Sequence, residues 1–269
     1  MMKTICTILL LLISLVLHAN HDVKVYYEKS DNGYIIYADN NEYCPVSIQL
    51  EFTVTNLRLH DQNNSVYVIQ PHQKKQLVTQ LTVIDKRKGY KLSYTSLTNY
   101  GDTTKDTYDQ EYHYDLPFAK GASFQVDQGY NGTFSHYTKN ALDFDMPIGS
   151  EVHAIRDGIV VKVVKQHNQN CGTKECKQYN NHIIIYHSDG TFAEYTHLKQ
   201  NGATVAIGDS IRQGQLIGYS GNTGWSTGPH LHLEVFLQRM RKRETLQTKF
   251  KVNNGTKVLF LKEKGTYKK

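Results

Sequence analysis

The sequence lacks the motifs of several common enzyme classes. It has no Gly-x-Ser-x-Gly nucleophile elbow, no phosphate-binding loop and no His-Glu-x-x-His helix. The formal net charge is +6, but the sequence has no basic patch flanked by aromatic residues of the kind that would indicate a nucleic-acid partner. This mild excess of positive charge favours an anionic partner, such as a cell wall or a membrane surface.

Long apolar runs are also absent, except at the start of the chain. Residues 5–17 are almost wholly apolar, with Lys3 before them and Ala19 after them. That layout is typical of a secretory signal peptide cleaved after Ala19. The run of about 13 residues is shorter than the ~20 that a membrane-spanning helix needs. We therefore expect an exported protein, either periplasmic, in the cell envelope or extracellular, with a signal peptide at 1–19 and no stable membrane span.

Cysteine is scarce, and helical periodicity is missing. Cys6 lies in the apolar run, so only Cys44, Cys171 and Cys176 remain after cleavage. In an oxidising compartment Cys171 and Cys176 would close a local disulfide and leave Cys44 free; otherwise the pair would form a metal clip. No amphipathic helix of about ten or more residues follows the signal peptide. The sequence therefore predicts an all-β protein.

Short strand-like segments separated by polar turns fill the first part of the chain. Ile48, Leu50 and Phe52 alternate with polar residues, as in a strand with one buried face. Such strands predict a small antiparallel β-sandwich-like domain. A polar, acidic segment that is typical of a linker follows, and glycine-punctuated strands then predict a second, mostly β domain. The predicted parts are an N-terminal domain at 20–98, a linker at 99–115, a second domain at 116–245, and C-terminal strands with a basic tail at 246–269.

Two histidines lie one residue apart in the segment "GPHLHLEVF". Side chains of a strand alternate between its faces, so His230, His232 and Glu234 share one face while the aliphatic residues face a core. Two imidazoles on a rigid strand can hold a divalent cation, or one can bind it while the other acts on its water. Alone, the pair is equally compatible with structural histidines.

Other residues strengthen the metal interpretation. Asp143 lies between Leu142 and Phe144, and a carboxylate in a buried strand is costly unless it is paired or bound to a metal. His136 precedes this aspartate, and His197 ends another predicted strand. A glycine-rich turn, "GYSGNTGWSTG", leads directly into the histidine pair.

In this order, the motifs "SH...ALDF", "MPIGSEVHAIRDGIV", "GTFAEYTHL" and "VAIGDSIRQGQLIGYSGNTGWSTGPHLHLEV" resemble the lysostaphin-type (LytM-like) zinc metallopeptidases, which are peptidoglycan endopeptidases. The resemblance covers about residues 116–245. It implies a LytM-like groove formed by antiparallel sheets, with one Zn²⁺ ion on its floor. It also implies His136, Asp143 and His232 as metal ligands and His197 and His230 as the catalytic pair.

One spacing departs from the commonest form of that family. The first histidine ligand usually precedes the aspartate by four residues, and that position here is Lys139, which cannot bind a metal while protonated. Some members instead carry "SH" further upstream, and this sequence resembles them. His136 serves as a ligand if the segment "YTKN" loops back toward Asp143. If it does not, only two ligands remain and the site is inactive.

The chemistry follows from this set of ligands. Three protein ligands leave zinc a fourth position for water, whose pKa it lowers to about 7. His230 or His197 would act as general base and the other would stabilise the oxyanion. Glu234 would either support an imidazole or form a surface ion pair.

The sequence thus predicts an exported zinc endopeptidase, with one zinc per chain, that hydrolyses peptide stems or cross-bridges of peptidoglycan. The alternative is a catalytically inactive LytM-like module that binds peptidoglycan or regulates another cell-wall hydrolase. A long polar loop at 165–181 is a candidate groove wall. The remaining histidines of this region match no ligand position and are expected on the surface or in strand hydrogen bonds: His153, His167, His182 and His187.

Overall fold

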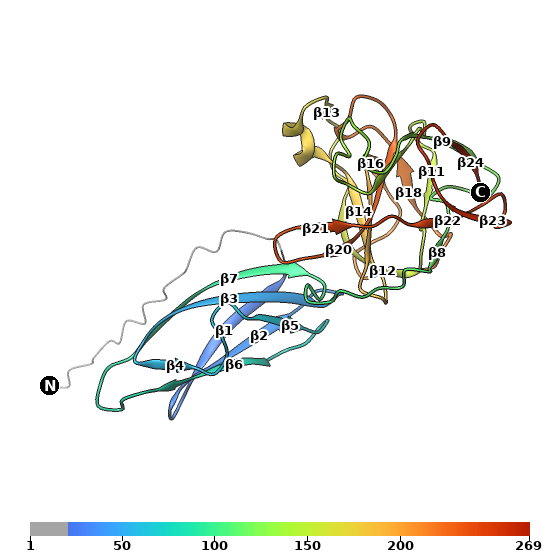
Figure 1. Ribbon diagram of the computed structural model, residues 1–269. Coiled ribbons are helices and arrows are strands. Elements are labelled where there is room, and N and C mark those ends of the chain that lie inside the picture. Colours follow the sequence, from blue (N-terminus) through green and yellow to red (C-terminus); the bar gives the residue numbers. More distant parts are fainter. Residues whose placement is uncertain (1–20) are drawn as a thin grey trace.

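The computed structural model describes residues 21–269 (Figure 1). The predicted signal peptide, residues 1–19, lies outside the described residues. Within 21–269 no helix is long and apolar enough to cross a membrane. Strands dominate this part of the chain, whose one helix is the short 3-10 helix η1 (Lys174–Tyr179). The prediction of an all-β protein is confirmed.

The N-terminal part is an antiparallel sandwich of two sheets, with the strand orders β1-β2-β6-β4 and β5-β3-β7. Ile48 and Leu50 of β3 are fully buried and Phe52 is 5% exposed, as their alternation predicts. They pack with Ile36 and Leu81 of the other sheet. The strands are β1 (Val23–Ser30), β2 (Gly33–Asn40), β3 (Val46–Thr55), β4 (Leu57–Leu59), β5 (Val66–Ile69), β6 (Gln76–Val83) and β7 (Lys91–Tyr100).

A larger antiparallel sheet organises the second part of the chain. Its order is β17-β12-β14-β15-β20-β10-β9-β24, with β21 beside β20. Distant segments therefore become neighbours, and β10 and β15 both pair with β20. Its strands are β9 (Ser123–Gln128), β10 (Ala141–Phe144), β12 (Gly158–Val164), β14 (His182–Tyr186), β15 (Phe192–Thr196), β17 (Ser210–Ile211), β20 (Leu231–Gln238), β21 (Arg243–Thr245) and β24 (Thr266–Lys268).

Three small sheets complete this part, with the orders β11-β18-β16, β13-β19 and β23-β22-β8. The C-terminal strands predicted at 246–269 are present as β22 and β23. The tail also contributes β24, which pairs with β9 at the edge of the large sheet. The bounds are β8 (His113–Tyr114), β11 (Glu151–His153), β13 (Asn170–Cys171), β16 (Leu198–Ala203), β18 (Leu216–Ser220), β19 (Gly224–Trp225), β22 (Lys249–Val252) and β23 (Lys257–Phe260).

The N-terminal sandwich packs on one face of the large sheet. Phe192 of β15 lies opposite Phe236 of β20, and both belong to an apolar cluster that includes Cys44. Because strand side chains alternate, this aromatic pair shares its face with His232, four residues before Phe236 on β20. The sandwich therefore docks on the same face as the paired histidines, further along the same strands.

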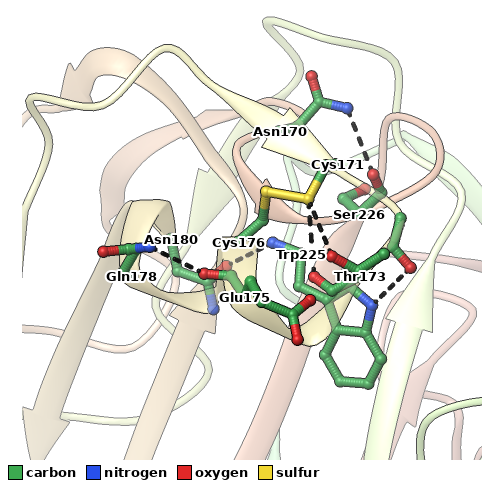
Figure 2. Close-up of a disulfide and its surroundings, with 10 residues drawn as sticks. Asn170, Cys171, Thr173, Glu175, Cys176, Gln178, Asn180, Trp225 and Ser226 are labelled. Atoms are coloured by element: carbon green, nitrogen blue, oxygen red, sulfur yellow. Dashed lines mark hydrogen bonds between the residues drawn. A yellow bond between two sulfur atoms is a disulfide. The ribbon is translucent and has the colours of Figure 1, made fainter.

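Cys171 and Cys176 form a disulfide, and Cys44 is free and buried (Figure 2). The disulfide prediction is confirmed, and the metal-clip alternative is wrong. The bond joins β13 to η1. The indole Nε1 of Trp225 on β19 donates to the carbonyl of Gly172 at 3.1 Å. The loop at 165–181 is thereby cross-linked and anchored to the neighbouring strand.

Candidate active site

Neighbouring strands place the acidic and imidazole side chains in one row. Asp143 of β10 lies opposite His232 of β20, and Gln128 of β9 lies opposite Asp143. The Nδ1 atom of His232 is 2.8 Å from Asp143 Oδ1. The alternation predicted for the segment "HLHLE" is present, because Leu231 and Leu233 face the core while His232 faces away from it.

His136 joins this row from the segment between β9 and β10. Its Nε2 atom lies 3.2 Å from Asp143 Oδ1 and 3.2 Å from His232 Nδ1. Its Nδ1 donates to the carbonyl of Gly129 at 3.0 Å, so Nε2 is the nitrogen that carries a free lone pair. The segment turns back because the Lys139 amide donates to the His136 carbonyl, with Thr138 at a left-handed φ of 60°. This loop brings His136 beside Asp143.

Gln128 connects the aspartate to this loop, and sequence reasoning missed it. Its Nε2 donates to Asp143 Oδ2 at 2.9 Å, and its Oε1 accepts from the amides of Phe134 and Ser135. The side chain thus fixes both the carboxylate and the segment that carries His136. The only sequence signal was a polar residue at the end of a strand, which is too common to single out.

The cluster of His136, Asp143 and His232 has the donor set and spacing of a zinc site. One donor atom from each residue lies within 4.8 Å of the others. Tetrahedral ligands at ~2.0–2.1 Å from one zinc lie about 3.3 Å apart, close to the separations found here. The side chain of His136 is fully buried, and those of Asp143 and His232 are largely buried.

The electrostatics of the cluster favour a positive charge at this point. Burial opposes ionisation of Asp143, but hydrogen bonds from both histidines hold its pKa well below the usual range. Burial likewise opposes protonation of His232, yet the carboxylates of Asp143 and Glu234 raise its pKa to about 10. A bound cation would satisfy the same carboxylate in place of a proton.

His197 and His230 lie beside the cluster, with their ring centroids 4.5 Å apart. His197 Nδ1 donates to the Thr223 carbonyl at 2.7 Å, and His230 Nδ1 donates to the Gly228 carbonyl at 2.8 Å. In each neutral ring the Nε2 atom is therefore the proton acceptor. Burial and the charges of the two neighbouring histidines lower the pKa of His197 to about 3, so its neutral form dominates near pH 7.

A row of charges separates the cluster from the docked sandwich. Glu194 and Glu234 lie directly opposite each other on β15 and β20, an arrangement that is unfavourable for two like charges. Arg243 bridges them, with Nη1 2.6 Å from Glu234 Oε1 and a second bond to Glu194. Glu234 Oε2 lies 3.7 Å from His232 Nε2. Glu234 therefore faces the imidazole and forms an ion pair, but it is 5% exposed, so the alternative of a surface ion pair is wrong.

One cavity of about 650 Å³, called the groove below, is lined by Asp143, His197, His230, His232 and Glu234 among others. Its lining residues all lie between residues 127 and 264, so the N-terminal sandwich does not line it. The loop at 165–181 contributes Lys177 and Asn180, as predicted for a groove wall.

The M23 peptidase family model matches residues 137–245. These residues are an M23 peptidase domain. The matched segment contains Asp143, His197, His230 and His232, whereas His136 lies one residue before it. The predicted resemblance to the lysostaphin-type metallopeptidases is therefore confirmed.

The chain is similar to several known proteins. The chain is 28% identical over 236 residues to an uncharacterized metalloprotease of Buchnera aphidicola, covering 80% of this chain and 58% of that protein. It is 37% identical over 99 residues to the peptidoglycan DD-endopeptidase ShyA of Vibrio cholerae, covering 37% of this chain and 20% of that protein. The lysostaphin catalytic domain of Staphylococcus simulans matches at 28% identity and a TM-score of 0.34, covering 46% of this chain and 87% of that one. The match thus covers little more than half of the Buchnera protein and about a fifth of ShyA.

The remaining histidines of the M23 domain lie outside the cluster of His136, Asp143 and His232. His153 bonds to the Gly214 carbonyl and to Glu151, and His182 bonds to the Asn180 carbonyl. His187 is fully buried, and its Nδ1 donates to the Asp157 carbonyl at 2.7 Å.

The burial of His187 predicts a loss of stability in acid. Burial and the Arg156 charge lower the pKa of His187 from 6.5 to about 4. The unfolded chain therefore binds a proton that the folded chain excludes, and the contribution present above pH 6.5 is lost as the pH falls toward 4. For one group this amounts to about 2 kcal/mol between pH 7 and pH 5.

Urea unfolding of chelator-treated protein at both pH values measures this loss. His187→Asn keeps a donor to the Asp157 carbonyl but has no imidazole to protonate. Between pH 7 and pH 5 its free energy of unfolding should therefore fall by about 2 kcal/mol less than that of the wild type. His113→Asn, at an exposed position, should behave as the wild type does. An identical acid loss in His187→Asn would rule out this residue as a source.

Proposed function

We propose that this protein is an exported zinc endopeptidase that hydrolyses peptide cross-links of peptidoglycan. The observation that carries the proposal is the convergence of His136, Asp143 and His232 on one point, with His197 and His230 beside it. The substrate class is inferred from the M23 domain and from relatives named as peptidoglycan endopeptidases. In this proposal residues 20–98 form the N-terminal domain, 99–115 the linker and 246–269 the C-terminal extension.

Each residue has a defined part in the proposed reaction. Zinc would be held by His136 Nε2, Asp143 Oδ1 and His232 Nδ1; when bound, it supplies a Lewis acid for the scissile carbonyl and lowers the pKa of a water to about 7. His197 and His230 present Nε2 acceptors, so one can take the proton of the attacking water and later deliver it to the leaving amine. The other can hydrogen-bond the developing oxyanion.

The alternative function is a catalytically inactive module that binds peptidoglycan or regulates another hydrolase. Such a module would be expected to lack a ligand or a member of the histidine pair. The chain has a candidate residue for each of these positions, which supports the enzyme.

Zinc analysis and product analysis together test the proposal. The purified protein should contain about one zinc per chain, and mass spectrometry of digested wall fragments should identify new amino and carboxyl termini within peptide cross-links. A chelator should stop the release of these fragments, and added zinc should restore it. A zinc-loaded protein that releases no fragments but still binds the wall would support the inactive module instead.

Gln128 provides a prediction about metal affinity. Its replacement by alanine removes the hydrogen bond to Asp143 Oδ2 and frees the segment that carries His136. Loss of such an outer hydrogen bond typically costs 10- to 100-fold in metal affinity, so we expect a zinc dissociation constant raised by roughly that factor. Competition with a chromophoric chelator measures it. Gln125→Ala, on the same strand but outside the groove lining, is the control and should leave zinc affinity unchanged.

A further inference from the structure

Two ammonium groups in the groove have no carboxylate partner. Lys139 belongs to the segment between β9 and β10, and Lys177 belongs to η1. Both line the groove, and neither forms an ion pair within residues 21–269. They come from different segments of the chain and line the same groove as Asp143 and His232, so a ligand in the groove can meet both.

Lys177 belongs to η1, directly after Cys176, whose disulfide with Cys171 is shown in Figure 2. The disulfide between Cys171 and Cys176 closes the loop just before it, and Asn180 Oδ1 accepts from the Trp225 amide at 3.0 Å. The Lys177 ammonium lies 4.9 Å from the Trp225 ring centroid, within the range of a cation–π contact. A lysine supported in this way loses less conformational freedom on binding an anion than one on a free loop.

Most other charged side chains that line the groove are paired, with the exceptions of Asp145 and Glu263. Arg243 bonds to Glu194 and Glu234, and Lys264 bonds to Asp127. Partial burial and the charges of Lys139 and Lys174 lower the pKa of Lys177, although the charge of Glu234 acts in the opposite direction, so other positive charges lie near its ammonium. An anion placed between Lys139 and Lys177 would relieve this repulsion.

We propose that Lys139 and Lys177 form an anion subsite that binds a free carboxylate of the peptide substrate next to the scissile bond. The inference rests on the proposed function, since it places a peptide in the groove. It identifies the preferred substrates as stems with free carboxylates rather than amidated stems or neutral cross-bridges. The two lysines determine specificity and take no part in bond cleavage.

The single tryptophan of the chain offers a direct test. The Lys177 ammonium contacts the Trp225 ring, so a ligand that binds Lys177 should change the fluorescence of this tryptophan. In the zinc-loaded full-length protein, a stem tetrapeptide with free carboxylates should therefore give a fluorescence response. The same peptide with every carboxylate converted to a carboxamide should bind at least about tenfold more weakly, because a charge-assisted hydrogen bond is lost. In the double variant K139Q/K177Q the two peptides should bind about equally.

Lys174→Gln is the matched control. Lys174 lies on the same helix, and its ammonium is 5.9 Å from the same indole ring, but it does not line the groove. This variant should keep the wild-type preference for the carboxylate peptide. Equal binding of both peptides by the wild type, or an equal effect of K174Q, would overturn the subsite. Because the readout is binding, a protein that prefers the carboxylate peptide yet cleaves no cross-link would contradict the proposed function and leave the subsite in place.

Discussion

Replacing His232 with alanine is expected to abolish cross-link hydrolysis and to reduce bound zinc from about one per chain to background. The variant loses Nδ1, the atom 2.8 Å from Asp143 and 3.2 Å from His136 Nε2. Two protein donors remain, one fewer than catalytic zinc sites use. Asp143 also keeps its burial while losing one of its two histidine partners, so the zinc-free variant should be less stable as well.

Metal analysis after gel filtration and fragment release from purified wall measure the two effects on His232→Ala. His113→Ala is the control, because this histidine is exposed and lies outside the groove lining. It should retain zinc and activity. A His232→Ala protein that keeps stoichiometric zinc and measurable hydrolysis would show that the metal is held elsewhere.

Replacing His197 with asparagine is expected to remove activity while leaving zinc in place. The backbone at His197 has a left-handed φ of 67°, which asparagine tolerates better than alanine. The asparagine amide can also donate to the Thr223 carbonyl in place of Nδ1. What the variant lacks is the Nε2 acceptor, and loss of a positioned acid–base group typically costs about 10²- to 10⁴-fold in rate.

Steady-state hydrolysis of a defined cross-linked peptide, together with zinc content and thermal unfolding, tests His197→Asn. We expect kcat/KM to fall by two orders of magnitude or more, with zinc content and melting temperature close to wild type. A parallel loss of zinc would instead assign His197 to metal binding. Unchanged kcat/KM would leave His230 as the sole acid–base candidate.

The fold class was predictable because its signals are local. Alternating apolar residues place one face of a strand in the core whatever the strand pairs with, so β3, β20, β22 and β23 could be recognised in the sequence. Short strands such as β13, β19 and β24 could not. Each has two or three residues, and their pairing partners lie far away in the chain.

The candidate site was predictable in part for the same reason. The segment "HLHLE" puts its imidazoles on one face through alternation alone, and a family resemblance identified their companions. Gln128 was missed because its importance comes from the strand opposite it and from the loop amides that it accepts, neither of which has a sequence signal. The bridging role of Arg243 likewise depends on two strands meeting side by side.

The sequence by itself determined the strand content, the donor atoms available and the face on which each would lie, since these depend on chemistry and on the two-residue period of a strand. Only the tertiary structure decided that the loop before β10 returns His136 to Asp143. It alone also decided that the sandwich docks on the groove face without lining the groove. Both outcomes depend on contacts between residues far apart in the chain, which are fixed by the packing of whole sheets and not by any local pattern.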